Sequence, residues 1–246
     1  MHRTIQAILF DLGDTLMYSP APWPPVFESA GRKLANALCS SEVDIDCNTF
    51  HLEFRQRLDE YYAERERNLV ETSTLTVLQE LLAEKGQNNI PENQLRAALD
   101  EFYATTQQNW VLEDDAIPML TTLQNNGIHI GLISNAGDNR DVFQLMEKFG
   151  IEQYFDFILT SAACGYRKPH PRIFELALAH WGYLPDETAM VGDRLDADIG
   201  GARPLGIYTI WIRKRTRMKF PLPTTPDATV DNLIEIPPLF LDSQEN

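Results

Sequence analysis

The stretch IQAILFDLGDTL, residues 5–16, sets the fold class of this chain of 246 residues. A short apolar run from Ala7 to Phe10 meets Asp11 and then turn-forming residues, which is typical of a buried strand that ends at a loop. Such strands lie in parallel sheets covered on both faces, and open α/β sheets bind ligands at the carboxyl ends of their strands. The segment is also compatible with an ordinary strand and turn, but the position of Asp11 suits a nucleophile or a metal ligand.

Three later segments place further polar side chains at strand ends or in a loop before a helix. They span residues 128–135, 165–169 and 189–199. Each also has an ordinary explanation, since Ser134 is suited to cap a helix, Lys168 to be a solvated loop charge, and the aspartates to occupy a first helical turn. Their order and strand contexts, taken together, favour a single site. The residues that they contribute are Ser134, Asn135, Lys168, Asp193, Asp196 and Asp198.

These four segments, in this order, resemble the four motifs of the haloacid dehalogenase superfamily, most of whose members are magnesium-dependent phosphatases. The resemblance extends from Ile5 to about Ile236, and residues 191–202, VGDRLDADIGGA, are especially close to the last motif. After Glu113 the helix and strand patterns alternate regularly, which predicts a parallel sheet with helices on both faces. We therefore expect an α/β fold with a Rossmann-like, doubly wound parallel sheet, in which a helix at about 196–203 and a C-terminal helix follow the later strands.

The long interval between the first two motifs is expected to form a separate helical domain. Aromatic and apolar residues recur at three- and four-residue spacings from Phe50 to Tyr62, as in an amphipathic helix, and the neighbouring segments repeat the pattern. We predict a Rossmann-like catalytic core over residues 1–16 and 113–246 and a helical cap over residues 17–112. In the family that the chain resembles, such an insert closes over the active site and contributes substrate contacts.

The resemblance also implies a role for each motif residue. Asp11 would attack phosphorus and form an aspartyl-phosphate, which water then hydrolyses. Ser134 and Lys168 would join it as catalytic residues, and both, together with Asn135, would bind the phosphoryl group of a small phosphorylated substrate. The cofactor implied is Mg²⁺, which prefers oxygen ligands. Its implied ligands are Asp11, the backbone carbonyl of Gly13 and Asp193, with Asp198 either as a further ligand or as an acceptor for groups that surround the ion.

One position departs from the family pattern. Phosphatases of the family usually carry a second aspartate two residues after the nucleophile, as general acid and base, and here that position is Gly13. The neighbouring Asp14 is displaced by one residue, which redirects its side chain. Because loss of a general acid typically costs about 10²–10⁴-fold in rate, we expect phosphatase activity to be low or restricted to easily departing groups.

Two alternatives to a phosphatase stay open at this point. The first is a carbon–halogen hydrolase of the 2-haloacid dehalogenase type, which shares the aspartate, serine and lysine positions but needs no metal. Such enzymes usually carry an aromatic residue where Gly13 stands and lack a carboxylate pair like Asp193 and Asp198, so the pair argues against this alternative. The second is a catalytically weakened binding or regulatory member of the fold.

Charge and hydropathy limit the partners that we expect. The formal net charge of −15 opposes binding to nucleic acid or to anionic membranes. The sequence holds no stretch that approaches the ~20 apolar residues of a membrane span. We expect a small-molecule substrate and a monomer or weak dimer. The basic segment Arg213–Lys219 is interpreted either as a solvated loop or as a grip on a phosphorylated substrate or acidic partner.

The three cysteines, Cys39, Cys47 and Cys164, show no C-x-x-C spacing and are odd in number. We interpret them as reduced thiols of a cytoplasmic protein. The first residues lead directly into a strand and lack a long apolar segment, so no signal peptide is expected.

Overall fold

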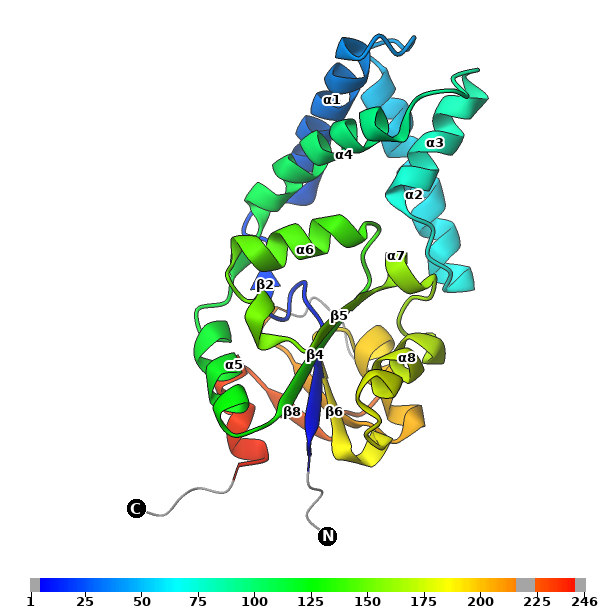
Figure 1. Cartoon of the computed structure of the whole chain (residues 1–246). Coiled ribbons are helices and arrows are strands. Elements are labelled where there is room, and N and C mark those ends of the chain that lie inside the picture. The colour runs from blue at the N-terminus through cyan, green and yellow to red at the C-terminus, as the bar shows by residue number, and fades with distance from the viewer. Residues whose placement is uncertain (1–4, 216–223, 242–246) are drawn as a thin grey trace. The chain divides into compact units, whose positions relative to one another are not determined.

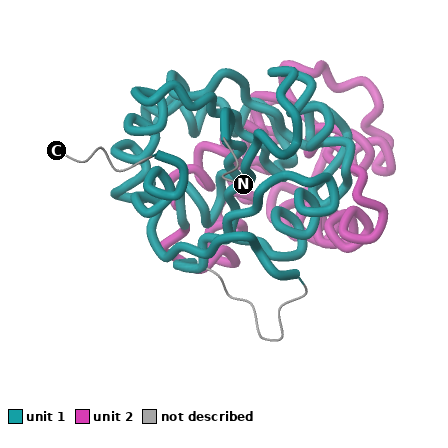
Figure 2. The backbone as a smooth tube through the Cα atoms, turned by 90° about the horizontal axis from the view of Figure 1, so that it is seen from below, with its two compact units in different colours: residues 1–18, 112–246 teal, residues 19–111 magenta. Residues whose placement is uncertain are grey.

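The computed structural model describes residues 5–215 and 224–241. The chain divides into two compact units, Met1–Tyr18 with Leu112–Asn246 (unit 1) and Ser19–Val111 (unit 2), which Figure 2 colours separately. Strands β2 (Met17–Tyr18) and β3 (Val111–Leu112) form a two-stranded sheet where the chain passes from one unit to the other. The roles of catalytic core and cap stay predictions for these two parts of the chain.

Unit 1 is built on a six-stranded sheet in the order β5-β4-β1-β6-β7-β8, in which every neighbouring pair is parallel. Strand β1 lies between β4 and β6 (Figure 1), and its four residues are buried, as its apolar run predicts. The predicted α/β fold with a parallel sheet is therefore confirmed. The six strands are β1 (Ala7–Phe10), β4 (His129–Ser134), β5 (Phe157–Thr160), β6 (Thr188–Gly192), β7 (Tyr208–Ile212) and β8 (Ala228–Val230).

Helices cover both faces of this sheet, with α5 and α8 on opposite sides in Figure 1. Ile173 and Phe174 of α8 pack in one buried cluster with Leu9 and Met190 from the central strands. The helix starts follow from local sequence: Asp138 caps α6 by accepting from the backbone N–H groups of the first turn, and α8 begins at a proline. The helices of unit 1 are α5 (Ala116–Asn125), α6 (Asn139–Lys148), α7 (Ser161–Cys164), α8 (Pro171–Trp181) and α9 (Gly200–Ala202).

Two expected helices of unit 1 are shorter or absent among the described residues. The segment at 196–203 is a π-helical turn, η4 (Leu195–Ile199), followed by α9 and by a 3₁₀ turn at Arg203–Leu205. After β8 the chain makes 3₁₀ turns at Leu233–Glu235 and Pro237–Leu239 in place of a C-terminal helix. Prolines limit helix length at both places, because Pro204 and the pair at 237–238 lack the N–H groups that a continuous helix needs.

Unit 2 is a bundle of four helices around its own apolar core. The predicted amphipathic spacing places Phe50, Phe54 and Leu58 on the buried face of α2, in one cluster with Leu34 of α1 and Leu99 of α4. No helix among the described residues has the length and apolarity needed to cross a bilayer. The helices are α1 (Trp23–Ser40), α2 (Phe50–Asn68), α3 (Thr74–Glu84) and α4 (Glu92–Thr106).

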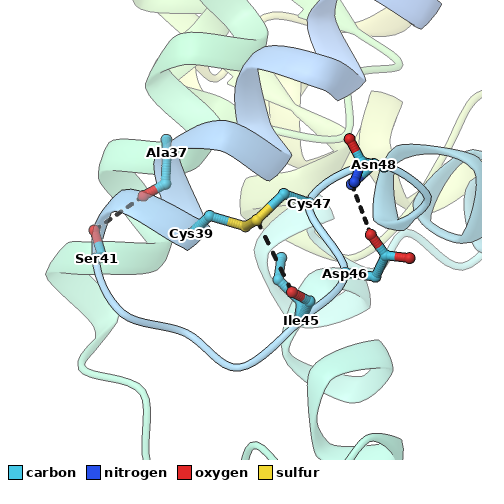
Figure 3. Close-up of a disulfide and its surroundings, with 7 residues drawn as sticks. All are labelled: Ala37, Cys39, Ser41, Ile45, Asp46, Cys47 and Asn48. Atoms are coloured by element: carbon cyan, nitrogen blue, oxygen red, sulfur yellow. Dashed lines mark hydrogen bonds between the residues drawn. A yellow bond between two sulfur atoms is a disulfide. The ribbon is translucent and has the colours of Figure 1, made fainter.

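The prediction of three reduced thiols is wrong for two of them. Cys39 and Cys47 form a disulfide in unit 2 (Figure 3), whereas Cys164 is not disulfide-bonded. The turn after α1 brings the two sulfur atoms together across eight residues, a separation that no common cysteine motif marks. The cytoplasmic location rested partly on reduced thiols and stays a prediction.

Removal of this disulfide should destabilise the protein. For a bond that closes a loop of this length, with a sequence separation of 8, the chain-entropy model gives about 2.5 kcal/mol of stabilisation. We expect Cys39→Ser to lower the free energy of unfolding by about this amount in urea titrations followed by circular dichroism. Cys164→Ser is the matched control and should leave it unchanged. A reductant should lower the stability of the wild type but not of Cys39→Ser, and wild-type stability that ignores the reductant would contradict the prediction.

Candidate active site

Three carboxylates gather at the carboxyl edge of the unit 1 sheet. Asp11 follows β1, Asp193 follows β6, and Asp198 lies in the turn η4. One oxygen atom from each lies within 4.8 Å of the others. The backbone N–H of Asp11 donates to the carbonyl of Val191 at 2.9 Å, which ties the end of β1 to β6. The parallel pairing of β1 with β6 therefore brings these acids together.

The ammonium group of Lys168 is buried among these acids. Its Nζ atom donates to Asp11 Oδ1 at 2.6 Å, lies 2.7 Å from Asp198 Oδ1, and donates to the carbonyl of Ile133 at 2.8 Å. The side chain is 1% exposed, so its charge is balanced by contacts rather than by water. A single ammonium group thus joins the ends of three strands, β4, β1 and β6.

The Lys168 loop is held by Asn135. The side-chain amide of Asn135 donates to the carbonyl of Lys168 at 2.9 Å, and its Oδ1 atom accepts from the Lys168 N–H at 2.8 Å. Asn135 therefore orients the backbone that carries Lys168. Its predicted contact with substrate stays a prediction.

The other predicted residues of the first two motifs lie at the same edge. Ser134 is the last residue of β4, is buried, and directly follows the carbonyl that accepts from Lys168. Gly13 belongs to the turn after Asp11, which closes when the N–H groups of residues 16 and 17 donate to the carbonyl of Leu12. Asp14 has a φ of 56°, in the left-handed region, which non-glycine residues adopt mostly in turns. The catalytic role of Ser134 and the metal contact of the Gly13 carbonyl stay predictions.

Burial and mutual repulsion govern the protonation of the cluster. The pKa of Asp193 is raised to about 8, chiefly by desolvation and in addition by the negative charges of Asp11, Asp198 and Asp14. Burial also raises the pKa of Asp198, against the opposing effect of Lys168. Burial alone would lower the pKa of Lys168, but the carboxylates of Asp11 and Asp198 outweigh it, and the net shift is upward. A group of carboxylates held together at this cost suits a cation, whose binding would release a proton.

Asp196 does not belong to this cluster. Its carboxylate forms an ion pair with Arg194 at 2.6 Å, and its side chain is 48% exposed. The turn η4 sends Asp198 toward the sheet and Asp196 toward solvent, although the two residues are separated by one position. The structure thus selects one of two candidate acids that the sequence presented side by side.

Sequence reasoning missed two residues that support the cluster. A Cβ atom at Gly192 would lie 2.2 Å from Asp198 Oδ2, so only glycine leaves room for that carboxylate at the end of β6. The indole N–H of Trp211, on β7, donates to the carbonyl of Asp193 at 2.9 Å. The glycine that directly precedes Asp193 was a signal that could have been found, whereas the contact of Trp211 depends on the pairing of β6 with β7.

Comparisons with known proteins agree on one family. A family model described as haloacid dehalogenase-like hydrolase matches residues 5–206. The glyceraldehyde 3-phosphate phosphatase of Methanopyrus kandleri is 30% identical over 241 residues, which cover 97% of this chain and 96% of that protein. The phosphoserine phosphatase of Thermus thermophilus is 31% identical over 160 residues, covering 65% of this chain and 62% of that protein.

Solved structures show the same fold at low identity. The 2-haloacid dehalogenase of Pseudomonas syringae aligns with a TM-score of 0.68 and 22% identity, over 96% of this chain and 97% of that one. A phosphatase of the same superfamily from Thermococcus onnurineus aligns with a TM-score of 0.65 and 21% identity, over 95% and 96%. Because both phosphatases and dehalogenases share the fold, the fold alone does not choose between their reactions.

Substitution of Gly192 should disturb Asp198 without removing any charged group. We expect Gly192→Ala to lower the free energy of unfolding by about 1–3 kcal/mol, as for other overpacked positions, because its Cβ atom displaces the carboxylate that contacts Lys168. Thermal unfolding measures the change. In an Asp198→Gly background the obstructing side chain is gone, so the same substitution should cost much less. Equal costs in the two backgrounds would contradict this account, because they would show that the two positions are independent.

Proposed function

The chain belongs to the haloacid dehalogenase-like hydrolase family, and we propose that it hydrolyses a small phosphorylated metabolite with Asp11 as the nucleophile. It is a phosphoric monoester hydrolase of that family, as its named relatives are. The observation that supports the assignment of residues is the contact of Lys168 with Asp11 at 2.6 Å, beside two further carboxylates. The arrangement joins a nucleophile, a fixed positive charge and a set of oxygen ligands.

The proposed reaction follows from what these side chains can do. A carboxylate oxygen of Asp11 attacks phosphorus, a new P–O bond forms, and the bond to the leaving oxygen breaks. Water then hydrolyses the aspartyl-phosphate, which releases inorganic phosphate and restores the Asp11 carboxylate. Lys168 balances negative charge next to the nucleophile, and we assign Ser134 as a hydrogen-bond donor to a phosphoryl oxygen. Asn135 acts on this step by holding the backbone of Lys168.

The residues of the cluster fit a divalent cation. Asp11, Asp193 and Asp198 offer hard oxygen ligands within 4.8 Å of one another, and we propose that they hold Mg²⁺ together with the carbonyl of Gly13. When bound, the ion supplies charge neutralisation to the transferring phosphoryl group. Asp198 has a second role, because it accepts from the backbone N–H of Arg194 at 3.0 Å and contacts Lys168. It therefore positions the lysine whether or not it contacts the ion.

The dehalogenase alternative is less favoured by the same cluster. A carbon–halogen hydrolase of this fold needs one aspartate and no metal, whereas here a partly buried Asp193 and a buried Asp198 lie beside the nucleophile at a cost in desolvation. The phosphatase relatives are similar in sequence, while the likeness to dehalogenase structures lies below 25% identity and concerns the fold. We also propose that unit 2 acts as the cap, that the protein is a monomer or weak dimer, and that it is cytoplasmic.

Replacement of the nucleophile tests the proposed reaction. Asp11→Asn keeps the size of the side chain but removes the attacking charge, so we expect hydrolysis of p-nitrophenyl phosphate to fall to the uncatalysed rate. The wild-type rate should depend on added Mg²⁺ and should disappear with a chelator. Incubation with 2-chloropropionate should release no chloride, and chloride release by the wild type would instead support the dehalogenase alternative. Hydrolysis that survives in Asp11→Asn would contradict the assignment of the nucleophile.

Restoration of an acid at position 13 tests the cause of restricted activity. Gly13 does not have a positive φ, so an aspartate fits its backbone without strain. We expect Gly13→Asp to raise kcat for alkyl phosphates about tenfold or more, since general acids contribute about 10²–10⁴-fold. Turnover of p-nitrophenyl phosphate should change less, because its leaving group departs without protonation. An unchanged kcat for alkyl phosphates would mean that another group already supplies the proton.

A further inference from the structure

The basic segment after β7 is paired with acids in its described part, residues 213–215; the remainder, residues 216–219, lies outside the described residues. Arg213 forms an exposed ion pair with Asp231. Lys214 and Arg215 both contact Glu113, a residue distant from them in sequence. The segment is therefore not simply a solvated loop, and two of its cations converge on one acid.

Glu113 is the buried centre of this cluster. Its side chain is 3% exposed, and its two oxygens accept from Arg215 Nε at 2.6 Å and Nη2 at 3.2 Å, in a bidentate pair. Lys214 Nζ donates to Glu113 Oε2 at 2.8 Å. Burial alone would raise the pKa of Glu113, but these two cations outweigh it and the net shift is downward. Partly buried, bidentate pairs of this kind hold a fixed geometry better than exposed pairs do.

Arg215 also contacts the other chain segment that links the two units. Its guanidinium carbon lies 3.6 Å from the centre of the Tyr18 ring, a cation–π contact. Tyr18 is the last residue of unit 1 before the chain enters unit 2, and Glu113 comes just after the chain returns. The N–H of Glu113 donates to the carbonyl of Leu16 at 2.9 Å. We call the two places where the chain passes between the units the crossings; Tyr18 lies at the first and Glu113 at the second. Arg215 thus contacts a residue at each crossing.

The strand that carries these cations also supports the candidate active site. Trp211, on β7, donates to the carbonyl of Asp193 at 2.9 Å. Lys214 and Arg215 follow the same strand by a few residues and hold the crossings. Residues in and just after β7 therefore contact both the backbone of Asp193 and the segments that lead into and out of unit 2.

We propose that Glu113, Lys214, Arg215 and Tyr18 form a crossing clamp, a set of positioning residues that fixes the two points about which unit 2 moves. The clamp rests on the proposed function in so far as unit 2 serves as the cap. The proposed role of the clamp is to limit the orientations that unit 2 can adopt when it moves, so that closure during the reaction repeats one geometry. In a variant that lacks the clamp contacts, we expect unit 2 to sample more orientations, of which a smaller share places substrate correctly for reaction.

Distances between the units test the clamp independently of activity. Spin labels at Gln79→Cys in α3 and Glu147→Cys in α6, in a Cys164→Ser background, report the distribution of distances between unit 2 and unit 1. Arg215→Ala should broaden this distribution, and Arg215→Lys should broaden it less because the charge remains. Arg213→Ala is the matched control, since its neighbouring ion pair with Asp231 does not involve a crossing. A distribution that is the same in wild type and Arg215→Ala would overturn the proposal.

Kinetics show whether the clamp matters for turnover. We expect Arg215→Ala and Glu113→Gln to lower kcat/KM for p-nitrophenyl phosphate about tenfold, a typical effect of positioning residues away from the chemistry, and Arg213→Ala to leave it unchanged. Thermal unfolding identifies any variant that fails to fold. If Arg215→Ala does not fold, kcat/KM and the distance distribution are compared between wild type and Arg215→Lys instead. A tenfold loss without broader distances would overturn the clamp and favour direct binding of phosphate by Arg215. If the wild type hydrolyses no phosphate ester, the proposed function fails while the distance measurement still decides the clamp.

Discussion

The contact of the Lys168 ammonium with Asp11 and Asp198 is the interaction on which the site depends. A charge that is almost fully buried must be paired, and here two carboxylates and one backbone carbonyl supply the partners. Loss of one partner from a buried pair costs about 3–5 kcal/mol, because the remaining charge is left without solvent. The lysine therefore fixes the carboxylates as firmly as they fix the lysine, and the three strand ends that carry them are held in one arrangement.

The parallel sheet makes this contact possible. The order β4-β1-β6-β7 places the ends of four strands side by side, so that Ile133, Asp11, Gly192 and Trp211 face the same edge. Each strand contributes a different element: a carbonyl, the proposed nucleophile, space for a carboxylate, and a donor that holds the Asp193 backbone. The three carboxylates outnumber the ammonium group, and this excess of negative charge is the feature that supports the proposed Mg²⁺ site.

The substitution of glycine at the usual acid position separates two parts of catalysis. In the proposed reaction the nucleophile, the positive charge and the metal ligands are present. The proton that the leaving oxygen takes up in the same displacement has no donor at position 13, where glycine carries no acidic group. Under the proposed function, substrate choice depends on the leaving group and on unit 2 as the cap, whose helices are held by their own core and disulfide.

The sequence by itself determined the strands, most helices, the α/β class and the set of residues to examine. Apolar runs and helical spacings are local properties that can be read along the chain. The order of the motifs predicted that Asp11, Lys168, Asp193 and Asp198 lie at one edge of the sheet. Tertiary structure decided what depends on distant partners or on directions within a turn. It places Asp198 against Lys168 but Asp196 against Arg194, and it joins Cys39 to Cys47 in a disulfide. It also brings Glu113 into contact with Arg215, 102 residues further along the chain. Such pairings arise because strand order and turn geometry bring side chains together, and a pattern along the chain records neither of them.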